Sequence, residues 1–164
     1  MKGARTCGPC TQCCRVMAVE ALGKPAGVTC DHVRQGKGCG IYDRRPNACR
    51  TFECVWLMDE EMPHRFRPDQ TKVVLDQDAK GQWLIARCDP GNPQAWRRAP
   101  MYAALKGRAR DTWGSGKIVL ATAGRRAWLI TPGEDIDLGE VDLSAGLRVT
   151  ERADGSVAVE AGRA

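Results

Sequence analysis

Four cysteines fall within eight residues near the start of the chain, in the segment CGPCTQCC. Cys7, Cys10 and Cys13 follow the spacing C-x2-C-x2-C, whose two-residue spacers let a tight turn direct neighbouring thiolates at one centre. Bacterial iron–sulfur runs open with the same spacing. Cys14 follows immediately, where such a run would continue with x3-C-P, so the segment does not predict a simple ferredoxin.

The adjacent pair of cysteines carries a prediction of its own. The Cα atoms of Cys13 and Cys14 must lie about 3.8 Å apart. In extended backbone, neighbouring side chains point to opposite sides. We therefore expect the two thiols to serve different centres, or one of them to bridge or support a centre.

Four further cysteines precede residue 55, among the turn formers RQGKGCG and RRPNACR. Loops of this kind can surround a metal centre without a second C-x2-C turn. Zinc or an iron–sulfur cluster usually takes four cysteines, so eight cysteines predict two four-thiolate sites, or one such site and several reactive thiols. The alternative is that the eight cysteines are scattered core residues that form no functional site, and their spacing disfavours this. The predicted metal ligands are Cys7, Cys10, Cys13, Cys14, Cys30, Cys39, Cys49 and Cys54.

Length and composition place these cysteines in a soluble chain. The 164 residues are 43% hydrophobic and 27% charged, which is typical of one globular domain. No apolar segment precedes the cysteines, and no later window approaches the length of a membrane span. We therefore expect a cytoplasmic protein without membrane association. Disulfides are rare in that compartment, so nine cysteines indicate metal or thiol chemistry.

The charge of the chain is concentrated on the cysteine segment. Residues 1–54 carry nine Lys/Arg and four Asp/Glu, a surplus of five, whereas residues 55–164 carry sixteen of each sign. Metal-bound thiolates are negative, so we expect these cations mainly to balance sulfur charge. A nucleic-acid patch is the rival use, but the segment has few aromatic residues for stacking and no recognisable binding module. The cations concerned are Arg5, Arg15, Arg34, Lys37, Arg44, Arg45 and Arg50.

The ordered motifs resemble a known family. CGPCTQCC, then CDHV, then GCGIYDRRPNACRTFEC followed by Trp56, are similar to the zinc- or iron-chelating domain family called CxxCxxCC, or YkgJ-like. The resemblance covers roughly residues 7–57 and includes all eight predicted ligands. It implies a metal-chelating protein, often of the iron–sulfur type, and it leaves the metal open between zinc and iron.

The fold class expected is α+β, with an irregular, metal-organised cysteine lobe at residues 1–66 packed on a scaffold at residues 67–164. In the scaffold, β-rich runs at about 71–76 and 82–88 predict a hairpin through Gly81. Cys88 would share a face with Leu84 and Ala86 and act as a buried hydrophobe.

The rest of the scaffold predicts one main helix and further antiparallel strands. Asn92 and Pro93 favour a helix start, but Pro100 can divide that segment into a short turn around Trp96 and a helix to Thr112. KIVLATA and RRAWLITP predict a hairpin around residue 124, and Asp-Gly at 154–155 predicts another turn. The stretch 133–146 is expected to be a loop.

Catalytic candidates are few, so enzyme activity stays undecided. His32 could lend an imidazole to a zinc site, but a supporting or surface role is favoured because the cysteines already complete the ligand sets. His64 has no partner histidine at helical spacing, and the acidic run 59–61 is typical of exposed surface. Three functions remain open: structural or chelating zinc, an iron–sulfur redox protein, and thiol-based metal storage or delivery. Metal ions are the expected partners; a protein partner is possible in each case and its identity is open.

Overall fold

A five-stranded sheet forms the scaffold of the computed structural model, which describes residues 5–78 and 80–161. The strands lie in the order β3-β4-β5-β6-β7, and all neighbouring pairs are antiparallel except β4–β5, which is parallel. Their bounds are β3 (Val73–Gln77), β4 (Trp83–Cys88), β5 (Ile118–Ala123), β6 (Arg126–Leu129) and β7 (Ile136–Glu140).

Both predicted hairpins of the sheet are confirmed. β3 and β4 pair with Val73 opposite Cys88 and Gln77 opposite Leu84. β5 and β6 turn through Gly124, which has the positive φ of 60° that a tight hairpin favours.

The expectation of a wholly antiparallel sheet is wrong at β4–β5. Parallel neighbours need a long crossover, and here it contains a short 3-10 helix, η4 (Ala95–Arg97), and the main helix α5 (Met101–Thr112). Division of this segment at Pro100 is confirmed. Asn92 does not cap η4, because Gln94 occupies the position before it.

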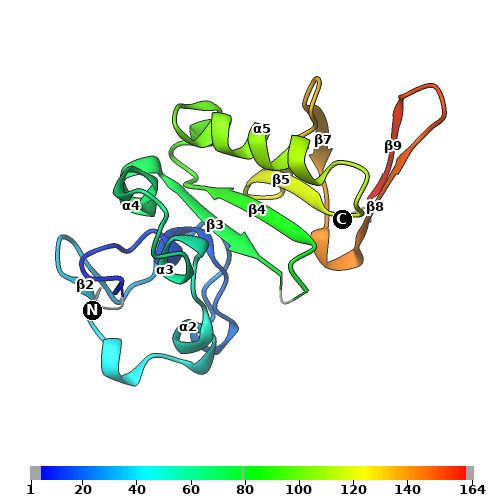
Figure 1. Ribbon diagram of the computed structural model, residues 1–164. Helices are drawn as coiled ribbons and strands as arrows, with labels where there is room; N and C mark the ends of the chain where they lie inside the picture. Colours follow the sequence, from blue (N-terminus) through cyan, green and yellow to red (C-terminus); the bar gives the residue numbers. More distant parts are fainter. Residues whose placement is uncertain (1–4, 79, 162–164) are drawn as a thin grey trace.

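Two layers of apolar side chains cover the sheet. Helix α5 lies over one face (Figure 1), where Leu105, Trp96 and Trp128 pack with Cys88, which is confirmed as a core residue. On the other face a cluster around Leu120 is partly covered by a separate hairpin made of β8 (Leu147–Glu151) and β9 (Val157–Ala161), whose predicted turn at 154–155 is confirmed.

The stretch 133–146 is not the loop that its acidic residues predicted. It contains β7 and a 3-10 helix, η5 (Leu143–Ala145). Ile136 and Leu138 alternate with Asp137 along β7, and both apolar side chains pack against the cluster on that face of the sheet. Alternation over only a few residues is a weak signal, and pairing with β6 makes it a strand.

The cysteine lobe is built of short elements at one end of the molecule (Figure 1). It packs on edge strand β3, where Val74 contacts a cluster containing Val16, Cys54 and Trp56. An α+β fold with a cysteine-rich N-terminus is thus confirmed, while the boundary at residue 66 stays a prediction. The elements that precede β3 are α1 (Cys13–Val16), η1 (Glu20–Leu22), β1 (Val33–Arg34), β2 (Gly38–Cys39), η2 (Tyr42–Arg44), α2 (Asn47–Thr51), α3 (Val55–Met58), η3 (His64–Phe66) and α4 (Pro68–Thr71).

Candidate metal centre

All eight predicted ligand cysteines line one cavity of about 200 Å³ in the cysteine lobe. Seven of them are half-buried, and Cys54 is buried. Cys88 does not line the cavity; it is 3% exposed in the core of the scaffold, and burial raises the pKa of its thiol to about 11. The structure therefore separates these eight thiols from the ninth, as the sequence predicted.

The first cysteines are presented by a turn that leads into α1. The Cys10 amide donates to the Cys7 carbonyl at 3.0 Å, which closes the turn. Cys13 and Cys14 then begin α1, so their side chains lie about 100° apart around a helix, not on opposite sides of an extended segment. Extended backbone was the wrong expectation here, because Gln12 already has helical backbone and accepts the first amide bonds of the turn.

The later cysteines come from a ribbon and two short helices. The Val33 amide donates to the Cys30 carbonyl at 3.1 Å, which closes a turn after Cys30. Val33 then lies opposite Cys39 in the β1–β2 ribbon. Cys49 lies inside α2, and Cys54 immediately precedes α3. These loops wrap the cavity without a second C-x2-C knuckle, in agreement with the prediction.

Close contact between the ribbon and the N-terminal turn depends on one glycine. A Cβ at Gly38 would lie 2.7 Å from the Gly8 carbonyl oxygen, and Gly38 has a φ of +94°. Only glycine suits both conditions. The contact brings the segment of Cys39 against the segment of Cys7.

Gly38→Ala is therefore expected to be among the more damaging glycine substitutions in the lobe. Strain at positive φ costs about 1–2 kcal/mol, and the backbone clash adds to it. Gly36→Ala is the matched control, because Gly36 has a φ of +71° but a Cβ there would meet nothing within 4 Å. Thermal unfolding of the protein as purified should show a clearly lower Tm for Gly38→Ala than for Gly36→Ala. Equal Tm values would contradict the close-contact explanation.

A buried carboxylate anchors the first cysteine segment to the scaffold. Asp89 follows β4, is 2% exposed, and accepts hydrogen bonds from the Gln12 side-chain amide at 2.8 Å and the Arg15 guanidinium at 3.1 Å. Burial alone would raise the pKa of Asp89, but the hydrogen bonds from Gln12, Arg15 and the Gly91 amide outweigh it and lower the pKa. Gln12 and Arg15 flank the Cys13–Cys14 pair, so the scaffold fixes the position of both thiols.

A second anchor holds α3 in place. The Arg5 guanidinium donates to the carbonyls of Trp56, Asp59, Glu60 and Met62 at 2.6–2.8 Å and lies over the Trp56 ring, 4.4 Å from its centroid. These acceptors lie in and just after the last turn of α3, where helix carbonyls have no partner within the helix. Arg5 thus ties the start of the chain to the helix that follows Cys54.

The adjacent Cys13 and Cys14 thiols influence each other's protonation. Sharing of a proton between them lowers the pKa of Cys14 to about 7 and raises the pKa of Cys13, because the proton held by Cys13 stabilises a thiolate on Cys14. The positive charges of Lys24 and Arg45 favour the same thiolate. Cys14 is accordingly the thiol best prepared to be deprotonated near neutral pH.

In metal-free, reduced protein we expect iodoacetamide to alkylate Cys14 before Cys13. The thiolate is the reacting form, so the Cys14 rate should rise as pH increases through about 7. Tandem mass spectrometry of the shared peptide distinguishes the two positions. Cys88, buried with its raised pKa, is the internal control and should stay unmodified in folded protein. Faster reaction at Cys13 would contradict this assignment of the proton.

Four other cavity thiols hold their protons more firmly than a free cysteine. Burial raises the pKa of Cys7, Cys10, Cys49 and Cys54, and charges on neighbouring thiols add to the effect at Cys7, Cys49 and Cys54. A metal would have to displace these protons, so metal affinity must fall on acidification. The same crowding of thiol charges is relieved when a cation enters among them.

One buried cation beside the thiols was not among the predicted site residues. Lys24 lines the cavity, is 7% exposed, and donates from Nζ to the carbonyls of Met17 and Pro25. Burial lowers the pKa of Lys24, and the thiol charges of Cys30 and Cys14 oppose that shift. A lysine is almost never buried without compensation, and here the two carbonyls and the neighbouring thiols supply it. No local sequence signal marks this position, because a thiol as distant in sequence as Cys49 is brought near only by folding.

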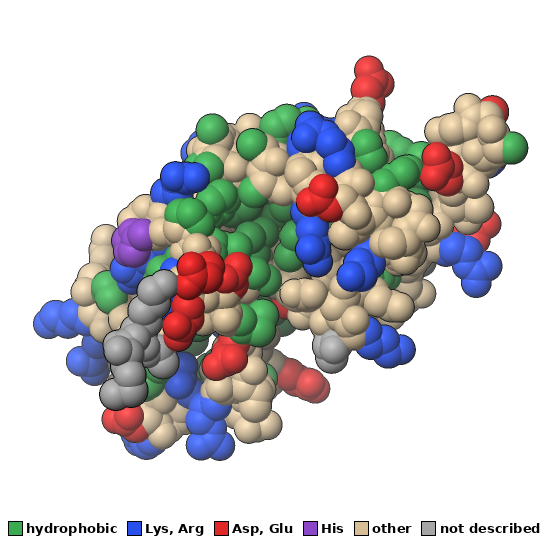
Figure 2. All heavy atoms as spheres, viewed as in Figure 1, with side chains coloured by type: hydrophobic (Ala, Val, Ile, Leu, Met, Phe, Trp, Pro, Cys, Tyr) green, Lys and Arg blue, Asp and Glu red, His purple; other side chains and the backbone are tan. Residues whose placement is uncertain are grey.

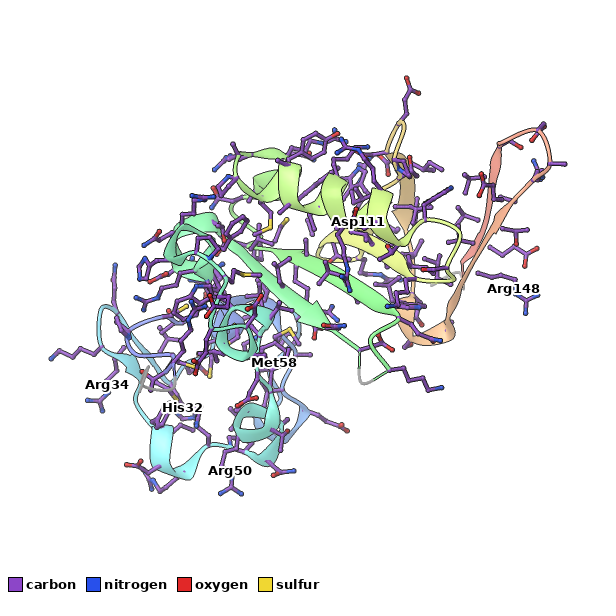
Figure 3. All side chains as sticks on the ribbon, viewed as in Figure 1. His32, Arg34, Arg50, Met58, Asp111 and Arg148 are labelled. Atoms are coloured by element: carbon purple, nitrogen blue, oxygen red, sulfur yellow. The ribbon has the colours of Figure 1, made fainter. Side chains whose placement is uncertain are left out.

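Two of the seven cations predicted to balance sulfur charge have other roles. Arg5 binds carbonyls and Arg15 pairs with Asp89, whereas Arg45 does line the cavity. The side chains of Arg34 and Arg50 extend outward from the lobe (Figure 3), and Lys and Arg side chains ring this end of the surface (Figure 2). Among the seven cations, Arg15, Arg34, Lys37, Arg44 and Arg50 are exposed. The prediction is therefore wrong for Arg5 and Arg15, since backbone carbonyls bind Arg5 and the buried Asp89 carboxylate binds Arg15.

The other candidates lie outside the cavity. His32 is exposed, and His64 packs edge-on against Trp56 while its Nδ1 lies 3.1 Å from the Gln70 amide nitrogen. The acidic run 59–61 is exposed, as predicted. Within residues 5–78 and 80–161, no three or more His, Cys, Asp or Glu side chains gather tightly enough to hold a single metal ion.

The walls of the cavity fit a soft metal centre. Thiols supply the donors that soft metals prefer, and the remaining lining is largely apolar, with Phe52, Leu57 and Val74 among it. Trp56 also lines the cavity, and its buried indole Nε1 finds no hydrogen-bond acceptor among the described residues. An unused N–H donor beside eight thiols is suited to a bound group that carries further sulfur.

Comparisons with known proteins identify no relative: no family model, curated protein or solved structure matches the chain. Across the described part of the chain, none of the helices has the length and apolar character that crossing a membrane requires.

Proposed function

We propose that this protein binds metal through the eight cavity cysteines and that the bound centre is of the iron–sulfur type. One observation carries the proposal: thiols from three separate segments, at residues 7–14, 30–39 and 49–54, line the same cavity. Eight half-buried or buried thiols in one place have no role in ordinary packing. Lys24 and Arg45 supply positive charge at the same place.

The space between the thiols favours an iron–sulfur centre over zinc. A zinc site closes four thiolates on one ion with bonds of about 2.3 Å and leaves no room between them. The cavity here measures about 200 Å³, more than ten times the roughly 15 Å³ that admits one water. A polynuclear cluster with inorganic sulfide would use that space, and the buried Trp56 N–H would meet an acceptor.

A bound cluster of this type would supply one-electron transfer. The residues of the chain would set its conditions. Apolar side chains such as Phe52 and Val74 exclude water from the thiolates, and Lys24 and Arg45 offset their negative charge. Both effects tune a reduction potential.

The test is the iron, zinc and acid-labile sulfide content of protein purified without oxygen, read with its visible spectrum. Iron with a matching amount of sulfide and a brown colour is the expected result. Zinc without sulfide, in a colourless protein, would replace the iron–sulfur assignment with a structural or chelating zinc site. Protein that takes up neither metal after anaerobic reconstitution would refute metal binding altogether.

A further inference from the structure

The eight cavity thiols divide into two groups by their position in the fold. Resting on the proposed metal function, we infer that they form two adjacent four-thiolate centres that meet at the Cys13–Cys14 peptide. The first set is Cys7, Cys10, Cys13 and Cys54, and the second set is Cys14, Cys30, Cys39 and Cys49.

Packing against strand β3 defines the first set. Cys54 is buried in the cluster of Val16, Trp56 and Val74, and Cys13 packs against the same cluster. The closed turn between Cys7 and Cys10 belongs to the same segment as Cys13. The thiol charges that act on Cys54 are those of Cys7 and Cys10, which places these thiols near one another.

Backbone hydrogen bonds define the second set. The Cys30 amide donates to the Cys14 carbonyl at 3.0 Å, so the two residues lie side by side. Cys30 leads through a turn into β1, whose Val33 lies opposite Cys39. The leading thiol charges that act on Cys49 are those of Cys14, Cys30 and Cys39.

Cys14 is the residue at the boundary, and ligand number decides its assignment. Its thiol contacts that of Cys13 and lies near Cys7, but its backbone is bonded to Cys30. Four thiolates complete a zinc or iron–sulfur site, and the first set already has four. On one turn of α1, side chains about 100° apart can be directed to two neighbouring centres.

The two centres would have different surroundings. The first is enclosed by the apolar cluster and Trp56. The second adjoins Lys24, on which the charges of Cys30, Cys14 and Cys49 act, together with that of the boundary thiol Cys13. Arg67 lies near Cys10 of the first set, but it is paired with Asp69 at 3.2 Å and so offsets little thiolate charge. An added electron is also less favourable in the more apolar site, so the first centre should have the lower reduction potential. Two adjacent centres with unequal potentials are suited to passing an electron from one to the other.

Double variants test the division. Full-length protein is reconstituted anaerobically with Fe²⁺ and sulfide, and metal per chain is measured. Cys10→Ser/Cys54→Ser and Cys39→Ser/Cys49→Ser should each retain about half of the wild-type metal, as their single variants do, because both changes strike one independent site. Cys10→Ser/Cys49→Ser should retain almost none. Equal loss from same-set and cross-set pairs would overturn the division.

A measurement on the wild type avoids variants that fail to fold. Reduced protein is given Co²⁺ in amounts below saturation and then alkylated, and mass spectrometry identifies the protected cysteines. The four thiols of each set should be protected together, with Cys13 and Cys14 separating between sets. Protection of all eight as one unit, or of mixed groups, would overturn the division while leaving metal binding intact. Uptake of neither iron with sulfide nor Co²⁺ by the wild type would refute the proposed function and the division together.

Discussion

Cys10→Ser and Cys49→Ser are each expected to release about half of the bound metal and to loosen the cysteine lobe, whereas Cys88→Ser is expected to retain the full metal content. Cys10 and Cys49 line the cavity, and Cys88 lies in the scaffold core. Metal bound by thiolates contributes on the order of 10 kcal/mol of coupled folding free energy, more than this lobe of short elements can obtain from apolar burial. No other substitution should have a larger effect.

Metal analysis and amide hydrogen exchange together measure this effect. Loss of metal should be accompanied by loss of amide protection in residues 5–66, with protection of the sheet largely kept. Cys88→Ser controls for thiol removal as such, although a buried hydroxyl in its place can lower the Tm. Equal metal loss from all three variants would contradict the assignment of ligands.

Arg5→Ala is expected to produce the second largest effect, a Tm lower by several degrees. Its guanidinium bonds four carbonyls around the end of α3 and covers the Trp56 ring. Hydrogen bonds from charged groups contribute about 1.5–3 kcal/mol each when shielded, and two of these four are exposed, so a total near 2–4 kcal/mol is expected. About 2–4 °C of Tm corresponds to each kcal/mol in a domain of this size.

Two controls separate geometry from charge at this position. Arg5→Lys keeps the charge but cannot offer the planar fork of donors, so most of the loss should remain. Arg126→Ala removes an exposed arginine that pairs with Asp137 on the sheet, and it should change the Tm little. A Tm for Arg5→Ala equal to that of Arg126→Ala would show that the anchor does not stabilise the lobe.

Much of the scaffold could be predicted because its signals are local. The β3–β4 and β5–β6 hairpins follow from alternating apolar residues and turn glycines, and the break at Pro100 follows from its fixed geometry. The parallel β4–β5 pair could not be predicted in this way. It depends on how α5 packs back across the sheet, and no short window of sequence records that.

The candidate site shows the same contrast between local signals, which could be predicted, and long-range contacts, which could not. Cysteine type and spacing were enough to predict which eight residues would be brought together, because thiols at short turn spacing have few uses apart from metal and thiol chemistry. They did not reveal Lys24, the use of Arg5 and Arg15 as anchors, or the link between the scaffold and the cysteines through Asp89. Those contacts join residues up to 77 positions apart.

The amino-acid sequence alone thus specifies the chemistry available to this protein: eight thiols in a cationic segment, followed by an α+β scaffold. The folded arrangement adds that the thiols surround one cavity, which charges face it, and how Cys13 and Cys14 are oriented on α1. The difference is one of range. Spacing and propensity act over a few residues, whereas Asp89 is buried against Gln12 and Arg15, which it meets only when the lobe packs against the scaffold.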